Sequence, residues 1–179
     1  MKEQQKKYEL TDEFIVHWSG KKLYRIRALV AFGAVAAGQL GGFVESEKNL
    51  DQSLSGNAWV SGNAWVYGNA QVYGDAKVCG DAQVYGNAKV YGNAWVSGNA
   101  WVYGNALVYG NALVYGNALV SSYAVILERK MIFWASNVGS ENGTLTVFNG
   151  KDGLIVTRGC FTGTVDEFLA KSARVHDDK

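Results

Sequence analysis

The chain of 179 residues lacks proline altogether and contains only two cysteines and two histidines. Without proline, its turns must be built from glycine and asparagine, and glycine is abundant at 22 residues. Cys79 and Cys160 are too few for a disulfide framework. We therefore expect two free thiols in a protein of a reducing compartment.

The chain also has no large excess of positive or negative charge. The 17 lysines and arginines nearly balance the 16 aspartates and glutamates, which leaves a net charge of +1. This balance argues against a basic track for double-stranded nucleic acid and against an acidic mimic of DNA. The apolar stretch 28–38 starts too late for a signal peptide and is too short to span a membrane. We interpret it as an apolar lead-in to the next segment.

What the chain does contain is a six-residue phrase, repeated twelve times without a gap between Leu54 and Val125. A copy has a branched apolar residue, then Tyr, Ser or Cys, then Gly, Asn or Asp, Ala and a variable residue; in the last copy alone, Ser122 and Tyr123 replace the Gly and the Asn or Asp. A group such as Trp65-Val66-Tyr67 is typical of a short strand that points outward, inward and outward. The Gly-Asn pair that follows tolerates a tight turn with positive φ, whereas one glycine per copy would weaken an α-helix. The fixed period predicts a parallel β-helix.

The phrase resembles that of the hexapeptide-repeat proteins, in which three copies make one coil of a left-handed β-helix. The resemblance implies about four coils of 18 residues. Three flanking segments, Leu23–Leu29, Gln39–Leu50 and Gly159–Phe168, resemble those of a phage and prophage group of hexapeptide-repeat proteins. Members of that group are usually recorded as uncharacterised or labelled as transferases.

We expect an all-β solenoid in three parts. Residues 1–53 form an N-terminal β-hairpin, with strands at Phe14–His17 and Leu23–Arg27, and the lead-in. Residues 54–125 form the β-helix. Residues 126–179 form a cap, which contains a β-hairpin around residues 149–153 and a helix at 165–175 that opens with a capping box. Solenoids need such caps because their terminal strands would otherwise pair with other chains.

Stacking of the coils predicts columns of outward side chains, while the inward valines and alanines leave no room for a ligand. Any site is therefore external. A polar side chain framed by two tryptophans, as at Lys77 and Gln83, suits a flat ligand or a side chain of a partner. The alternative is that the aromatic columns only stabilise neighbouring strands. The candidate binding residues are Trp59, Lys77, Trp95, Trp65, Gln83, Trp101, Tyr73, Tyr91, Arg25 and Arg27.

Catalytic groups are scarce in the repeats. Hexapeptide acyltransferases typically use a histidine that protrudes from a coil, but the two histidines here are His17 and His176, outside the coils. Each is read as an ordinary surface or packed histidine. Cys79 has no neighbouring base, and Asp75 and Asp81 replace asparagine in turns. We expect no catalytic residues, no metal site and no cofactor.

The resulting hypothesis is a non-catalytic, phage-encoded binding protein of the bacterial cytoplasm. It would serve as an accessory or counter-defence factor that binds a host protein or sequesters a nucleotide-type ligand. The outward aromatic residues and the family resemblance predict a homo-oligomer, which we take to be a trimer. One alternative is an acyltransferase that uses His17 or His176 across a subunit interface. Another is a structural or virion spacer.

Overall fold

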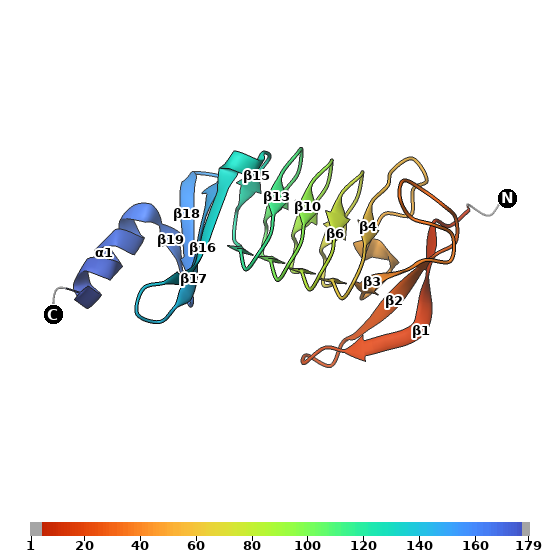
Figure 1. Ribbon diagram of the computed structural model, residues 1–179, viewed down its shortest axis with the longest axis horizontal. Coiled ribbons are helices and arrows are strands. Elements are labelled where there is room, and N and C mark those ends of the chain that lie inside the picture. Colours follow the sequence, from red (N-terminus) through yellow and green to blue (C-terminus); the bar gives the residue numbers. More distant parts are fainter. Residues whose placement is uncertain (1–4, 177–179) are drawn as a thin grey trace.

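The computed structural model describes residues 5–176 as an elongated solenoid with a small β-sheet structure at each end (Figure 1). Two-residue strands recur every six residues through the repeats. They are β4 (Trp59–Val60), β5 (Trp65–Val66), β6 (Gln71–Val72), β7 (Lys77–Val78), β8 (Gln83–Val84), β9 (Lys89–Val90), β10 (Trp95–Val96), β11 (Trp101–Val102), β12 (Leu107–Val108), β13 (Leu113–Val114), β14 (Leu119–Val120) and β15 (Val125–Ile126). The predicted parallel β-solenoid is confirmed.

The coils repeat every 18 residues, as predicted. Trp59 pairs in parallel register with Lys77, and Lys77 pairs with Trp95 one coil further on. Three faces result, each a parallel sheet. We call them face 1 (β4, β7, β10, β13), face 2 (β5, β8, β11, β14) and face 3 (β6, β9, β12, β15).

Each corner is built as the phrase predicts. The repeat glycines from Gly62 to Gly116 have φ between 62° and 72°, a conformation that costs other residues steric strain. Ser122 replaces glycine in the last copy and still adopts a φ of 57°. The inward valines and alanines are at most 1% exposed, so the prism is filled by its own side chains.

The solenoid has about five turns, one more than the repeats predict. β3 (Leu40–Val44) pairs in parallel with β5, and Leu50 forms a parallel bridge with Val72. The short helix η1 (Glu47–Asn49) replaces one corner of this extra turn. Its sequence lacks the repeated phrase, so periodicity alone does not reveal it. Two adjacent glycines of β3 allow the close approach, since a Cβ on Gly42 would lie 2.6 Å from the carbonyl oxygen of Ala64.

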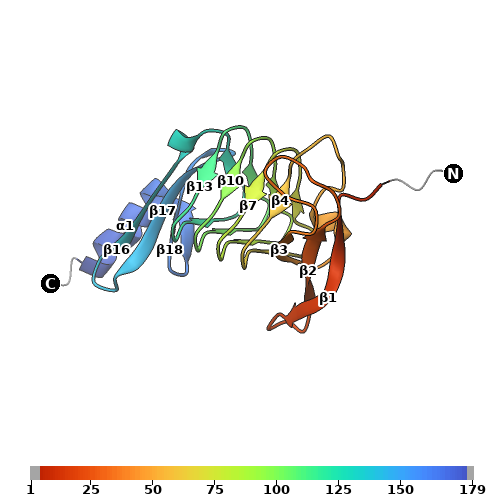
Figure 2. The same ribbon diagram turned by 45° about the vertical axis from the view of Figure 1, so that its right-hand side comes forward.

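The predicted N-terminal hairpin is confirmed and continues the sheet of face 2. Strands β1 (Tyr8–Val16) and β2 (Lys22–Ala28) are antiparallel, and β2 pairs with β3. The first strand begins at Tyr8, earlier than predicted, because Tyr8 is fully buried and donates its hydroxyl hydrogen to the carbonyl of Leu50 at 2.7 Å. Figure 2 shows the far end of the hairpin projecting beyond the body of the solenoid.

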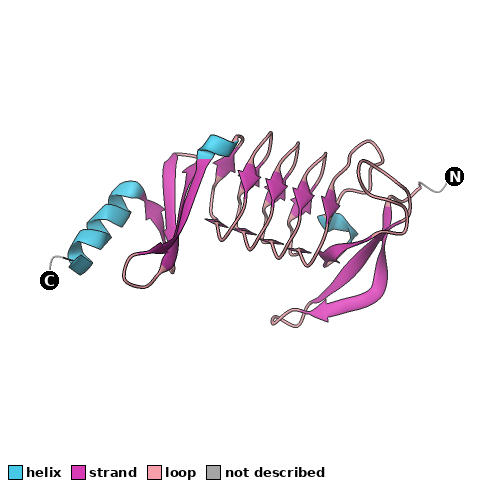
Figure 3. Cartoon of the chain, in the orientation of Figure 1, coloured by secondary structure: helices cyan, strands magenta, loops and turns pink. Residues whose placement is uncertain are grey.

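The C-terminal segment forms a four-stranded antiparallel sheet and one helix (Figure 3). A short helix, η2 (Arg129–Met131), leads into the sheet. The strands are β16 (Ile132–Val138), β17 (Gly143–Gly150), β18 (Gly153–Arg158) and β19 (Phe161–Thr164). The predicted hairpin is confirmed, with Asn149 opposite Leu154.

The predicted helix is also confirmed, as α1 (Val165–His176). Its capping box is present: Thr164 donates its backbone N–H to Glu167 Oε2 at 2.7 Å, and Glu167 N–H donates to Thr164 Oγ1 at 3.2 Å. The predicted apolar side is only partly used. Phe168 is half-buried against Phe161, with ring centroids 5.5 Å apart, whereas Leu169 is 58% exposed.

The C-terminal sheet closes the last coil through hydrogen bonds to strand β14. Leu119 donates its backbone N–H to Thr146 Oγ1 at 3.0 Å, and its carbonyl accepts the Thr157 hydroxyl at 2.7 Å. Phe148 is fully buried in the common core. This contact satisfies backbone groups that an open solenoid end would leave unpaired.

Candidate functional site

Face 1 differs from the other two faces in the residues that follow each strand. Faces 2 and 3 carry mainly tyrosines there, whereas the first three strands of face 1 are followed by the small residues Ser61, Cys79 and Ser97, and its fourth strand, β13, by Tyr115. The small residues lie beside the predicted column of Trp59, Lys77 and Trp95. The missing bulk leaves a hollow along part of face 1.

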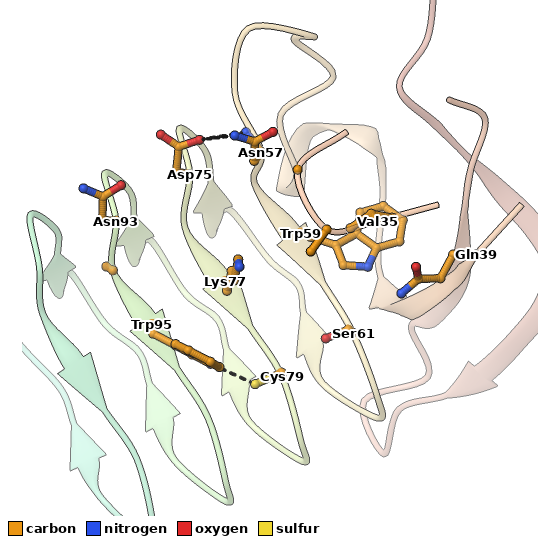
Figure 4. Close-up of a pocket in the computed structure, with 13 residues that line it drawn as sticks. Val35, Gln39, Asn57, Trp59, Ser61, Asp75, Lys77, Cys79, Asn93 and Trp95 are labelled. Carbon is orange, nitrogen blue, oxygen red and sulfur yellow. Dashed lines mark hydrogen bonds between the residues drawn. The ribbon is translucent and has the colours of Figure 1, made fainter. Parts of the chain in front are cut away.

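The hollow is a groove of about 460 Å³ (Figure 4). One wall is the loop after β2, through Gly33, Ala34 and Val35, and the opposite end is formed by Trp95. This volume falls within the roughly 300–1,000 Å³ typical of small-molecule sites. The remaining lining residues are Gln39, Asn57, Trp59, Ser61, Asp75, Lys77, Cys79, Asn93 and Ala94.

The indole of Trp95 is the aromatic surface that the groove offers. It is 46% exposed, and its Nε1–H donates to Cys79 Sγ at 3.0 Å. This bond fixes the ring across the groove (Figure 4). The sequence predicts no partner for Cys79. Its partner, Trp95, lies 16 residues further along the chain and is brought close by the stacking of the coils. The ammonium of Lys77 lies 5.8 Å from the centroid of the Trp95 ring, within reach of a cation–π contact.

Trp59 does not frame Lys77 as an open indole. It is 4% exposed, because Phe32 and Tyr8 pack edge-on against it at centroid distances of 5.4 Å and 6.3 Å. Its buried Nε1–H has no hydrogen-bond acceptor among residues 5–176. Lys77 is therefore flanked by a half-exposed indole on one side and by a covered indole on the other.

Asp75, which lines the groove, links its corner to the corner of the preceding coil by hydrogen bonds. Its Oδ1 accepts hydrogen bonds from the backbone N–H and the side-chain amide of Asn57, at 3.1 Å and 2.7 Å. Asp81 accepts the amide of Asn63 at 3.2 Å in the same way. Within residues 5–176, no three His, Cys, Asp or Glu side chains are grouped to hold a metal ion.

The second predicted column, with Trp65, Gln83 and Trp101, lies on face 2 and is partly covered by the hairpin. The His17 ring lies 5.9 Å from Trp65 and 4.7 Å from Tyr67, centroid to centroid. His17 is 5% exposed and therefore a packed histidine. Trp101 is 41% exposed, and it does not line the groove of face 1.

The other candidate residues lie outside the groove and contact other parts of the protein. Tyr73 and Tyr91 stack on face 3 with ring centroids 4.8 Å apart, and burial raises the pKa of both hydroxyls. Arg25 lies in the hairpin, where its Nε donates to Glu13 at 2.8 Å and its guanidinium covers the ring of Phe43 at 4.2 Å. Arg27 pairs with Glu9. Neither arginine lines the groove.

The arrangement on face 1 can hold a planar group against Trp95 and a negative charge near Lys77. Histidine is not among the residues that line the groove. His176, the last residue of α1, belongs to the opposite end of the chain. No helix within residues 5–176 has the length and apolar character needed to cross a bilayer.

Comparison with known proteins agrees with the architecture. Three overlapping segments, 82–98, 88–104 and 100–115, match the family model of the YdcK beta solenoid repeat. These segments cover the central coils and none of the end structures. No curated protein matches the chain. The central coils of this β-solenoid protein are thus similar to the YdcK beta solenoid repeat.

Proposed function

We propose that the chain is a non-catalytic binding protein that holds a small, flat ligand in the groove of face 1. The half-exposed indole of Trp95, fixed by Cys79 inside a hollow of about 460 Å³, carries this proposal. A ring stacked on an aromatic side chain gains roughly 1–3 kcal/mol, and this gain does not depend on its exact identity. Lys77 adds one positive charge beside the same ring.

The lining of the groove supports binding rather than catalysis. Cys79 is the thiol that reaches it, and its sulfur accepts the Trp95 N–H, with no histidine in the lining to act as a base. The buried core of alanines and valines holds the backbone rigidly around the groove. A rigid, pre-formed site suits sequestration, because little conformational entropy is lost on binding.

The biological setting is part of the same proposal. Resemblance of the flanking segments to a phage group supports an accessory or counter-defence role in the cytoplasm of a bacterial host. There, a nucleotide-type ligand would be held and kept from its host receptor. The family resemblance also supports a homotrimer, with one groove on each subunit.

Isothermal titration calorimetry with AMP, GMP and acetyl-coenzyme A tests the proposal. We expect AMP or GMP to bind, and Trp95→Ala to weaken binding by about 5- to 150-fold, the factor that corresponds to one lost stacking contact. Trp101→Ala is the matched control, since Trp101 is similarly exposed but lies on face 2. We expect Lys77→Gln to weaken binding of the nucleotides more than that of the nucleosides.

Three results would count against the proposal. The first is no binding of either nucleotide, and the second is equal losses in Trp95→Ala and Trp101→Ala. A third, turnover of acetyl-coenzyme A that depends on His17, would restore the acyltransferase alternative. The host-protein alternative predicts instead that substitution of the exposed tryptophans weakens capture of a partner protein, while neither AMP nor GMP binds.

A further inference from the structure

The covered end of the groove contains a hydrogen-bond donor without an acceptor. Trp59 is only 4% exposed, and its Nε1–H has no hydrogen-bond partner among the described residues. A buried donor of this kind is costly unless something accepts its hydrogen. The indole nitrogen lies on the side of the ring that faces Gln39, another lining residue (Figure 4).

Gln39 supplies a second donor at the same end. Its Oε1 accepts the backbone N–H of Ala36 at 3.0 Å, so its amide nitrogen is the part that remains to donate. In Figure 4 this nitrogen points toward the Trp59 indole. Two N–H donors cannot form a hydrogen bond with each other, but both can donate to the same acceptor.

The cation in the groove lining also favours a negatively charged acceptor. Lys77 lies one coil from Trp59 and one coil from Trp95, about 5 Å along the stack in each direction. The carboxylate of Asp75, which also lines the groove, is engaged by Asn57 through two hydrogen bonds and interacts with the buried ammonium of Lys7. Lys77 is the one lining cation in the described chain, and no ion pair holds it there.

We propose that this end of the groove is an oxyanion subsite, in which an oxygen of the ligand accepts hydrogen bonds from Trp59 Nε1–H and Gln39 Nε2–H, with the Lys77 ammonium further along the same groove. This inference rests on the proposed function and narrows its ligand class. The flat ring of the ligand stacks on Trp95, and its phosphate or carboxylate group lies roughly one to two coils away, or about 5–10 Å.

The loop that covers Trp59 must move for an oxygen of the ligand to reach the Trp59 N–H. It runs between Gly33 and Gly38, both in the left-handed region at φ values of 50° and 82°. A Cβ on Gly38 would meet nothing within 4 Å, and Ala34, Ala36 and Ala37 are exposed. Displacement of its tip, residues 36–38, would therefore sacrifice little buried surface and leave in place Phe32 and Val35, which pack in the core and pair through two backbone hydrogen bonds. The hydrogen bond from Ala36 to Gln39 is the contact that a bound ligand would rearrange.

Two substitutions remove the donors while leaving the surroundings in place. Trp59→Phe keeps an aromatic ring under Phe32 but has no N–H. Gln39→Glu keeps an oxygen to accept the Ala36 N–H but replaces the amide donor with a negative charge. Gln39 is exposed, so this second variant remains informative where Trp59→Phe fails to fold.

The probes are AMP, which has a phosphate, adenosine, which lacks it, and indole-3-acetate, which has a carboxylate on a flat ring. We expect each variant to bind AMP about tenfold more weakly than the wild type does, the effect of losing one hydrogen bond to a charged group. Binding of adenosine should change less than about twofold, since adenosine presents no oxyanion. Comparing AMP with indole-3-acetate tells a phosphate site from a general oxyanion site. Trp101→Phe, on face 2, should alter none of these affinities.

The outcomes separate this inference from the proposed function. Equal weakening of AMP and adenosine binding would show that Trp59 and Gln39 only support the structure of the groove, and would overturn the subsite. Unchanged AMP binding in both variants would do the same, while a loss in Trp95→Ala would leave the proposed function standing. Failure of the wild type to bind any of the three probes would overturn both.

Discussion

Substitution of one corner glycine tests how the C-terminal sheet is seated on the solenoid. Gly116 has a φ of 66°, and a Cβ at this position would overlap the six-membered ring of Trp134 in β16. Trp134 in turn packs edge-on against Tyr115, with ring centroids 5.6 Å apart. Gly116→Ala should therefore push Trp134 off the corner and loosen the cap.

The expected magnitude is the sum of two terms. A non-glycine residue in the left-handed region costs about 1–2 kcal/mol. An inserted methyl group in a packed contact costs about 1–3 kcal/mol more. We expect Gly116→Ala to lower the free energy of unfolding by about 2–5 kcal/mol in total.

Gly20 provides the matched control. It has a similar φ of 83° in the hairpin turn, but a Cβ there would meet nothing within 4 Å. Gly20→Ala should therefore show the backbone term alone, about 1–2 kcal/mol. Gly86→Ala is intermediate, because its Cβ would lie 3.0 Å from the backbone nitrogen of Gly104, which cannot rotate away as a side chain can.

Urea titration followed by circular dichroism measures these free energies. Long repeat arrays can unfold in more than one step, so the slope as well as the midpoint must be compared among the variants. Limited proteolysis provides a local readout, since a loosened cap exposes its aromatic residues to chymotrypsin. Equal losses of stability in Gly116→Ala and Gly20→Ala, with no gain in cleavage, would refute the seating of Trp134 on this corner.

Four further predictions follow from the same structure. Truncation after Val120 should expose open strand edges and cause aggregation, visible by light scattering; a monodisperse truncated protein would contradict the capping role. Alanine at both His17 and His176 should leave ligand affinity within about twofold, provided that circular dichroism shows the fold intact; loss of function in a folded double variant would favour an enzyme. Cys79→Ser retains an acceptor for the indole N–H in the groove and should bind ligand nearly as the wild type does, whereas Cys79→Ala should bind about fivefold more weakly; equal affinities would show that the N–H···S bond does not position the ring. Burial, and then the neighbouring tyrosines, raise the pKa of the Tyr85 hydroxyl to about 12, whereas an unfolded tyrosine titrates near 10. The stability contributed by neutral Tyr85 is thus fully present below about pH 10 and is lost as the pH rises toward 12, which melting curves and tyrosinate absorbance would follow; a flat profile would contradict the burial of this column.

The sequence by itself determined the solenoid and its register. A glycine at every sixth position fixes where the chain can turn with positive φ, and the alternation of outward and inward residues fixes which side chains fill the prism. Both are local properties, and they fix the positions of the strands and corners. The resemblance to hexapeptide-repeat proteins added that three copies make one coil, which predicted the pairing of Trp59 with Lys77 and of Lys77 with Trp95. The two hairpins and the capping box of α1 were predictable from local sequence as well, because turn and cap residues act on their immediate neighbours.

The location of the groove was decided by tertiary structure. Three faces carried aromatic or polar columns, and only the folded chain shows that the loop near Gly33 covers Trp59 and walls the hollow on face 1. That loop has no period, and its contacts join residues far apart in sequence. The bond between Trp95 and Cys79 and the unpartnered N–H of Trp59 likewise depend on side-chain directions that a repeat does not specify. A period sets the positions of the backbone, whereas a site depends on which side chains meet where the period ends.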